Sequence, residues 1–170
     1  MTGKGDFKFY YTHERDLNLD KTPRIFQRYL IRSRHKWDID ERTNFTSEYY
    51  RIVDSKMFVI GTEYNFLKDY FFREYEKNTR PISYVLLHHS FSYSSADVYI
   101  EKRTNRWYTE VEKLPQITYS LPSIQLGESP FYFENTSSAT NFNSKQAVPS
   151  PSTSDVNVIR FDTSNKFSLP

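Results

Sequence analysis

The sequence predicts an α+β protein: a small domain with two or three helices followed by an antiparallel β-meander, plus a long extended C-terminal tail. Three observations lead to this class. Apolar residues recur at helical spacing between 23 and 77, the spacing becomes that of strands between 82 and 111, and beyond Leu114 the chain is rich in Pro, Ser and Asn. We therefore expect a compact domain over 1–114 and an extended tail over 115–170.

The first expected elements are a short strand and a helix. Phe7–Tyr11 alternates well enough for a strand. Thr22 and Pro23 then resemble a helix start, since Thr caps helices and Pro fits the first helical position. Apolar side chains follow at near-helical spacing, at Ile25, Phe26, Tyr29, Leu30 and, less regularly, Ile31. These features predict a helix over 23–36.

Two interpretations compete for the next segment. In one, a helix runs from Ser47 to Ile60 and a second runs from Thr62 to Lys77. In the other, 49–53 and 57–60 form a hairpin ahead of the same second helix. We favour the helical interpretation, because Tyr50, Val53, Met57 and Ile60 share one helical face.

The pattern changes after Pro81, which ends the helical segment. ISYVLLHHSFSY is apolar at both even and odd positions, which is typical of a strand covered on both faces. A hairpin should follow, with strands at Val98–Glu101 and Trp107–Val111 and a turn near 103–106.

The tail raises the question of what holds a segment such as NTSSATNFNSKQAVPSPSTS in place. Its own contacts cannot offset an ordering cost of about 1–2 kcal/mol per residue. Apolar islands interrupt it, and extended segments dock by adding a strand to another sheet. We expect docking on neighbouring subunits, with the tail folding back on its own domain as the alternative. The expected docking residues are Phe131, Tyr132, Phe133, Val158, Ile159 and Phe161.

The strongest local charge signal is basic. Five cations fall within the predicted helix, with no acid between them: Arg24, Arg28, Arg32, Arg34 and Lys36. Such a stripe can follow the phosphates of a nucleic acid. The alternatives are a solvated helix face, pairing with acids elsewhere in the chain, or a protein interface.

No pattern indicates catalysis, a metal or a cofactor. The chain has no cysteine, and its 4 glycines form no phosphate-binding loop. There is no G-x-S-x-G serine motif. His88 and His89 sit in an expected strand, where neighbours point to opposite faces and cannot easily share one metal. We therefore expect no enzyme, no metal site and no cofactor.

Composition limits the partners. The net charge is only +2, so no global field attracts a polyanion, and 14 Phe and 14 Tyr suit a core or an extensive interface. We expect a structural or assembly subunit of a large multi-protein particle, with a virion or phage capsid, connector or tail component first. The alternative is a nucleic-acid-binding or regulatory protein.

The expected location is a virion or other large assembly, otherwise the cytoplasm or nucleus. The N-terminal residues show no apolar signal segment, and no apolar run is long enough to cross a membrane. Its partners would be other protein subunits, including copies of itself. No motif indicates a known family.

Overall fold

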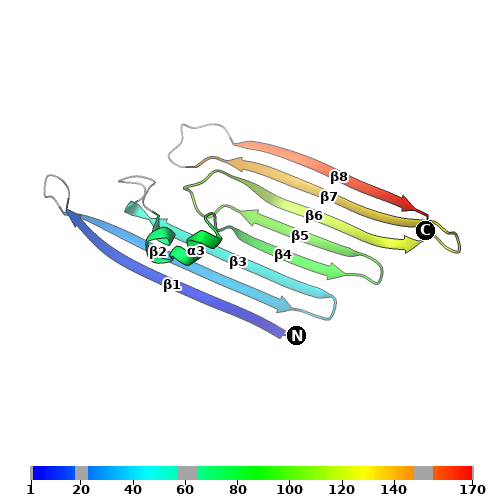
Figure 1. Cartoon of the computed structure of the whole chain (residues 1–170), viewed down its shortest axis with the longest axis horizontal. Helices are drawn as coiled ribbons and strands as arrows, with labels where there is room; N and C mark the ends of the chain where they lie inside the picture. The colour runs from blue at the N-terminus through cyan, green and yellow to red at the C-terminus, as the bar shows by residue number, and fades with distance from the viewer. Residues whose placement is uncertain (1, 18–22, 57–64, 148–154, 170) are drawn as a thin grey trace.

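The chain forms one antiparallel sheet of eight strands that follow one another in sequence order, β1 to β8. The computed structural model describes residues 2–17, 23–56, 65–147 and 155–169. Figure 1 shows the strands side by side, with β1 and β8 at opposite edges. The strands are β1 (Thr2–Leu17), β2 (Pro23–Asp38), β3 (Thr43–Asp54), β4 (Ser83–Ser90), β5 (Ser95–Lys102), β6 (Glu110–Gln125), β7 (Tyr132–Lys145) and β8 (Val156–Ser168). The α+β prediction is therefore wrong.

Two short helices, α2 (Phe66–Tyr70) and α3 (Phe72–Lys77), lie over β1–β3 (Figure 1). Asn65 caps α2, because its side-chain oxygen accepts hydrogen bonds from the backbone N–H groups of Leu67 and Lys68. We call the side of the sheet that carries these helices the helix face, and the opposite side the open face.

The predicted helix over 23–36 is strand β2, which pairs with β1 and β3. A spacing of four residues keeps side chains on one side of a strand as well as of a helix, so the arginine spacing did not separate the two. Ile25 and Ile31 lie on the open face, and Phe26 and Leu30 on the helix face. Pro23 is the first residue of the strand, a position that tolerates proline.

The favoured helix over 47–60 is also wrong up to residue 54, because Thr43–Asp54 is strand β3. The alternative hairpin needed a second strand over 57–60, which lies outside the described residues. In the described part of the helix expected over 62–77, which starts at Asn65, there are two short helices, α2 and α3, which meet at Phe71.

The strands predicted within β1, β4 and β5 are confirmed, and β5 does form a hairpin with β6. The second strand expected over Trp107–Val111 is wrong except at residues 110 and 111, because β6 begins at Glu110 and Val98 pairs with Ile117. β1 extends beyond Phe7–Tyr11 on both sides, and the β5–β6 connection is longer than the expected turn. β4 was expected to be covered on both faces, yet Val85 and Leu87 are exposed on the open face.

The extended tail is corrected as well. The division expected at 114/115 falls within β6. Strand β7 pairs with β8 in one register, and β6 pairs with β7, with two register shifts, and with β5. The polar segment around 135–145 is thus held by backbone hydrogen bonds to two neighbouring strands of its own sheet.

The buried core lies at one end of the sheet, between β2, β3 and the helices. Leu30, Tyr50, Ile52, Phe66 and Leu67 form it. Partly buried rings pack around this cluster, at Phe71, Tyr75 and Trp107. Tyr10 on β1 adds ring contacts, with its centroid 5.8 Å from that of Phe66 and 5.2 Å from that of Phe71.

β3 continues beyond the end of its pairing with β4. Along that part, side chains rather than a neighbouring strand bond the backbone groups of β3. Asn105 is fully buried and donates to the carbonyl oxygens of Tyr50, at 2.9 Å, and Pro81, at 3.0 Å. Its side-chain oxygen accepts from the N–H of Ile52 at 2.8 Å. Ser83 accepts from the N–H of Tyr50 at 2.9 Å. The polar backbone beside the core is therefore satisfied.

Replacing Asn105 with Ala should destabilise the fold strongly. The change leaves the buried N–H group of Ile52 without its partner, at about 1–3 kcal/mol for an unsatisfied group. The carbonyl oxygens of Tyr50 and Pro81 each lose one bond but keep those from the Thr104 and Tyr108 hydroxyls. Urea unfolding measures the loss. Asn165→Ala on exposed β8 is the control and should change stability by less than about 0.5 kcal/mol. Equal effects of the two changes would show that Asn105 has no such role.

Candidate functional site

A buried arginine joins the helices to the sheet. Arg28 on β2 is 1% exposed. Its guanidinium donates to Glu14 on β1 at 2.8 Å, Asp54 on β3 at 2.9 Å and Asp69 on α2 at 2.5 Å. Lys56 and the Tyr70 hydroxyl also bond Glu14, so the cluster connects four segments that are distant in the sequence.

The charges in this cluster stabilise one another. Burial opposes the charge on Arg28, but its hydrogen bonds to Asp54, Asp69 and Glu14 outweigh burial and raise the pKa of the guanidinium. Burial likewise opposes the charge on Glu14. Hydrogen bonds from Tyr70, Arg28 and Lys56 prevail and lower the pKa of Glu14 to about 2.

Two further predicted cations are also paired with acids. Arg32 contacts Asp6 at 3.2 Å and Glu74 at 3.5 Å, and Arg34 donates to Glu48 at 2.9 Å. The bond to Glu48 raises the pKa of Arg34. The other two, Arg24 and Lys36, are exposed on the same strand. All five predicted cations lie on the helix face rather than on a helix.

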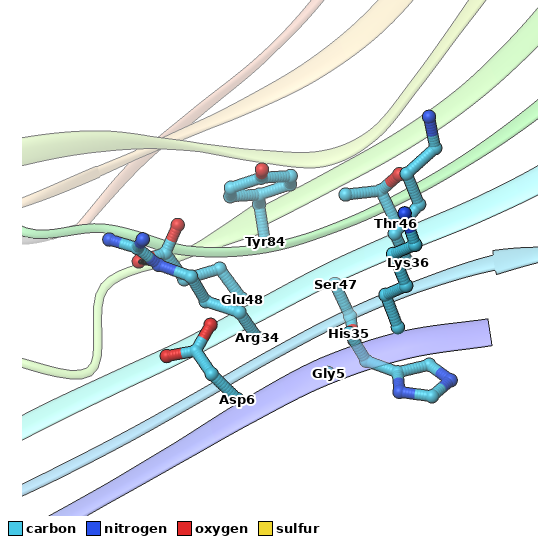
Figure 2. A pocket seen from close by; sticks show the side chains of 10 residues that line it. Gly5, Asp6, Arg34, His35, Lys36, Thr46, Ser47, Glu48 and Tyr84 are labelled. Carbon is cyan, nitrogen blue, oxygen red and sulfur yellow. Dashed lines mark hydrogen bonds and ion pairs between the residues drawn. The ribbon is translucent and has the colours of Figure 1, made fainter.

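A shallow hollow of about 350 Å³ lies beside Arg34, lined partly by Asp6, Lys36, Glu48 and Tyr84. Figure 2 shows the Arg34, Glu48 and Tyr84 side chains on one side of the sheet and the His35 ring on the other. The Arg34 guanidinium is already bonded to Glu48, so mixed charges line this hollow. Carboxylates already pair with the guanidinium groups of Arg28, Arg32 and Arg34. This region is therefore poorly suited to bind the phosphates of a nucleic acid.

The two adjacent histidines point to opposite faces, as expected. His88 contacts Asp97 at 2.5 Å, and His89 contacts the Thr43 hydroxyl at 2.8 Å. Across residues 2–17, 23–56, 65–147 and 155–169, no three His, Asp or Glu side chains gather in a way that could hold a metal ion.

The most extensive candidate surface is the open face. Residues directly opposite each other in neighbouring strands share a face, so the strand registers define rows across the sheet. One row crosses β2 to β8: Trp37, Phe45, Leu87, Val98, Ile117, Ala139 and Phe161. A sheet face this apolar normally packs against another layer.

Much of the open face is exposed, and its centre is uncharged. Exposed apolar side chains on it include Phe7, Phe9, Ile25, Val85, Leu87, Val98, Ile100, Ile117, Tyr119, Ile159 and Phe161. The helix-face positions of β5–β8 instead carry Asp97, Glu101, Lys113, Glu134, Arg160, Asp162 and Lys166. Most charged residues of β5–β8 therefore lie on the helix face, together with the apolar residues Phe142, Val156 and Val158. Neither face of β5–β8 has a helix over it in Figure 1.

A second hollow, of about 340 Å³, lies in the open face. Ala139 and Ser137 on β7 form its floor, because they are small residues between larger ones. Ile117 and Tyr119 on β6 line one side, and Phe161 on β8 lines the other. The depression has the size and apolar lining to receive one large apolar side chain.

The predicted docking residues are divided between two places. Phe131 is exposed just before β7, and Tyr132 and Phe133 begin β7. Val158, Ile159 and Phe161 lie exposed on β8. Phe133 and Phe161 share the open face, while Val158 lies on the helix face.

Sequence analysis did not identify the open-face residues of β3–β6. Alternation at Val85, Leu87, Val98 and Ile100 was the available signal, but strand register was needed to align them with Ile117.

No helix within the described ranges is long and apolar enough to cross a membrane. Comparison of the chain with protein families, curated proteins and solved structures finds no match. The expectation of a structural role in a virion has no support in the fold or in the comparisons.

Replacing Arg28 with Ala should lower the free energy of unfolding by about 3–5 kcal/mol, because it removes the buried cation that three carboxylates face. Arg24→Ala, an exposed change on the same strand, is the matched control. Urea unfolding at pH 7 should show a large loss for Arg28→Ala only. Comparable losses would contradict a central role for the cluster.

Stability should fall in acid as Glu14 protonates. Because folding lowers its pKa from 4.5 to about 2, Glu14 stabilises the fold above pH 4.5, and this contribution disappears as the pH falls toward 2. Glu14→Gln should therefore be less stable at pH 7 and show a shallower decline between pH 4.5 and 2 in urea titrations. Glu128→Gln, in the exposed turn before β7, controls for loss of a carboxylate. Identical slopes in the two variants would rule out the linkage.

Proposed function

We propose that this chain is a protein-binding subunit of a multi-protein assembly, and that its open face contacts the neighbouring protein. The observation that carries the proposal is the uncharged apolar row from Trp37 to Phe161, which nothing in the described part of the chain covers. Exposed contiguous apolar surface of this kind typically marks a protein contact.

The size of the open face suits a stable contact. The shortest strands, β4 and β5, have 8 residues, and the others are longer. Counted at that shortest length, with about 3.4 Å per residue and strands about 4.8 Å apart, the sheet presents on the order of 900 Å². A standard interface buries about 800 Å² on each partner. An open face used in full is therefore large enough for a specific complex.

The chemistry of the open face defines the partner. An uncharged centre disfavours a partner that would bury its own charges there without compensation. The partner should present an apolar surface with one large side chain, which enters the hollow above Ala139 between Ile117 and Phe161. Nucleic acid fits this surface poorly, since it carries a charge at every phosphate.

Site-specific photo-crosslinking tests the proposal. A photoreactive residue at Val98 or Ile117, on the open face, should give a discrete adduct with one protein in cells that express the chain. The same residue at Lys113, on the helix face, should give none.

The identified protein is then purified, and its affinity for the chain is measured. Val98→Asp should weaken binding by about 100-fold, because it buries a charge in an apolar contact, whereas Lys166→Ala should change it by less than about twofold. Equal crosslinking from both faces, or an affinity unaffected by Val98→Asp, would refute the proposal.

A further inference from the structure

Strand β8 ends the sheet with an unprotected edge. Its inner edge pairs with β7 from Val156 to Ser168 in an unbroken register, and within the described ranges no strand pairs with its outer edge. Every residue of β8 is exposed. Natural edge strands are commonly short, bulged, interrupted by proline or charged. β8 is long and continuous, and its only charged residues are Arg160, Asp162 and Lys166. Such an edge is suited to receive another strand.

We propose that β8 is a self-association edge: two copies of this chain pair their β8 strands antiparallel about a two-fold axis at Phe161. The two sheets then become one continuous sheet, in which residue 160 of each copy faces residue 162 of the other.

Charge complementarity selects this arrangement. Arg160 and Asp162 lie on one face of β8, with the Arg160 Nε 2.8 Å from an Asp162 oxygen. Around a dyad at Phe161, Arg160 of each copy stands directly opposite Asp162 of the other, so two new attractive pairs form. Opposite charges at facing positions stabilise antiparallel strands.

The neighbouring registers are unfavourable. A dyad at Asp162 would place the two Asp162 carboxylates opposite each other, and a dyad at Arg160 would do the same to the two guanidinium groups. Like charges at facing positions are destabilising. A dyad at Ser164 would pair Asp162 with Lys166, but it overlaps a shorter part of β8.

The apolar residues of β8 agree with the same register. Phe161 is 78% exposed and Ile159 is 66% exposed, although both lie on a sheet face. At the dyad the two Phe161 rings face each other, and Ile159 stands opposite Thr163 of the other copy. In this register, odd-numbered residues of one β8 stand opposite odd-numbered residues of the other. Odd-numbered residues of β8 lie on the open face, so the open faces of both copies lie on the same side of the joined sheet.

The other edge of the sheet is less suited to pairing. β1 contains Gly3 and Gly5, and glycine weakens a strand. Pairing β1 of one copy with β8 of another would also generate open chains of molecules rather than a closed dimer.

The absence of cysteine permits a direct test of the dyad. In full-length Phe161→Cys, the new thiols of the two copies face each other at a Cα separation of about 4.5–5.5 Å, which is within disulfide range. Glutathione disulfide as oxidant should yield a covalent dimer at low micromolar protein. Thr163→Cys, one step along the same face, should form no disulfide-linked dimer under the same conditions, because Thr163 stands opposite Ile159 of the other copy. Ser164→Cys should form a disulfide-linked dimer only if the dyad lies at Ser164 instead.

Charge reversal provides a test that keeps Phe161. Analytical ultracentrifugation of the parent chain should show a monomer–dimer equilibrium. Arg160→Asp should weaken the dimer by about tenfold, since both cross-strand pairs become repulsive, and adding Asp162→Arg should restore it to within about threefold.

Three results would overturn the inference: a monomer up to about 100 μM, crosslinking at residue 164 but not at 161, or open-ended oligomers. Failure of this inference can also be distinguished from failure of the proposed function. Val98→Asp should leave the residue-161 crosslink intact, and Arg160→Asp should leave photo-crosslinking at Val98 intact.

Discussion

The buried guanidinium of Arg28 is the interaction on which the rest of the structure depends. It takes one carboxylate from each of β1, β3 and α2, so strand order and helix placement are fixed at a single point. A buried charge is tolerated only with well-placed partners, and α2 supplies one of the three. The aromatic core beside it then closes over Leu30 and Ile52.

This arrangement divides the sheet into two unequal parts. Strands β1–β3 have a core and two helices on one face, whereas β5–β8 are held chiefly by the ladder itself and by cross-strand pairs. Most charged side chains of β5–β8 still lie on one face: Glu101 and Lys113 are on the helix face, whereas Val98 and Ile117 are on the open face. If both faces were in contact with water, an apolar face would contribute nothing to stability. Burial of that face against a partner would be favourable, and we therefore connect it to binding.

The sequence indicates strands well where β-branched residues alternate with polar ones, as at Val98 and Ile100. It indicates them poorly where both faces of a strand carry apolar residues. In β2 both faces carry apolar residues, and the arginine spacing fits a helix equally well. The Arg28 cluster could not be predicted, because Glu14, Asp54 and Asp69 are far from it in sequence and only the sheet register brings them together. For the docking surface, the exposed aromatic residues near the C-terminus were recognisable. Their alignment with Leu87 and Ile117 depends on register, which no local pattern reveals.

The meander topology has a consequence for how the molecule opens. Each strand pairs only with its neighbours in sequence, so the sheet resembles a linear array in which end units can separate without disrupting the middle. The buried core is located in β2, β3 and the helices, far from β8. Amide hydrogen exchange should therefore be slowest in β2 and β3 and become faster stepwise toward β8, so that the C-terminal strands fray before global unfolding.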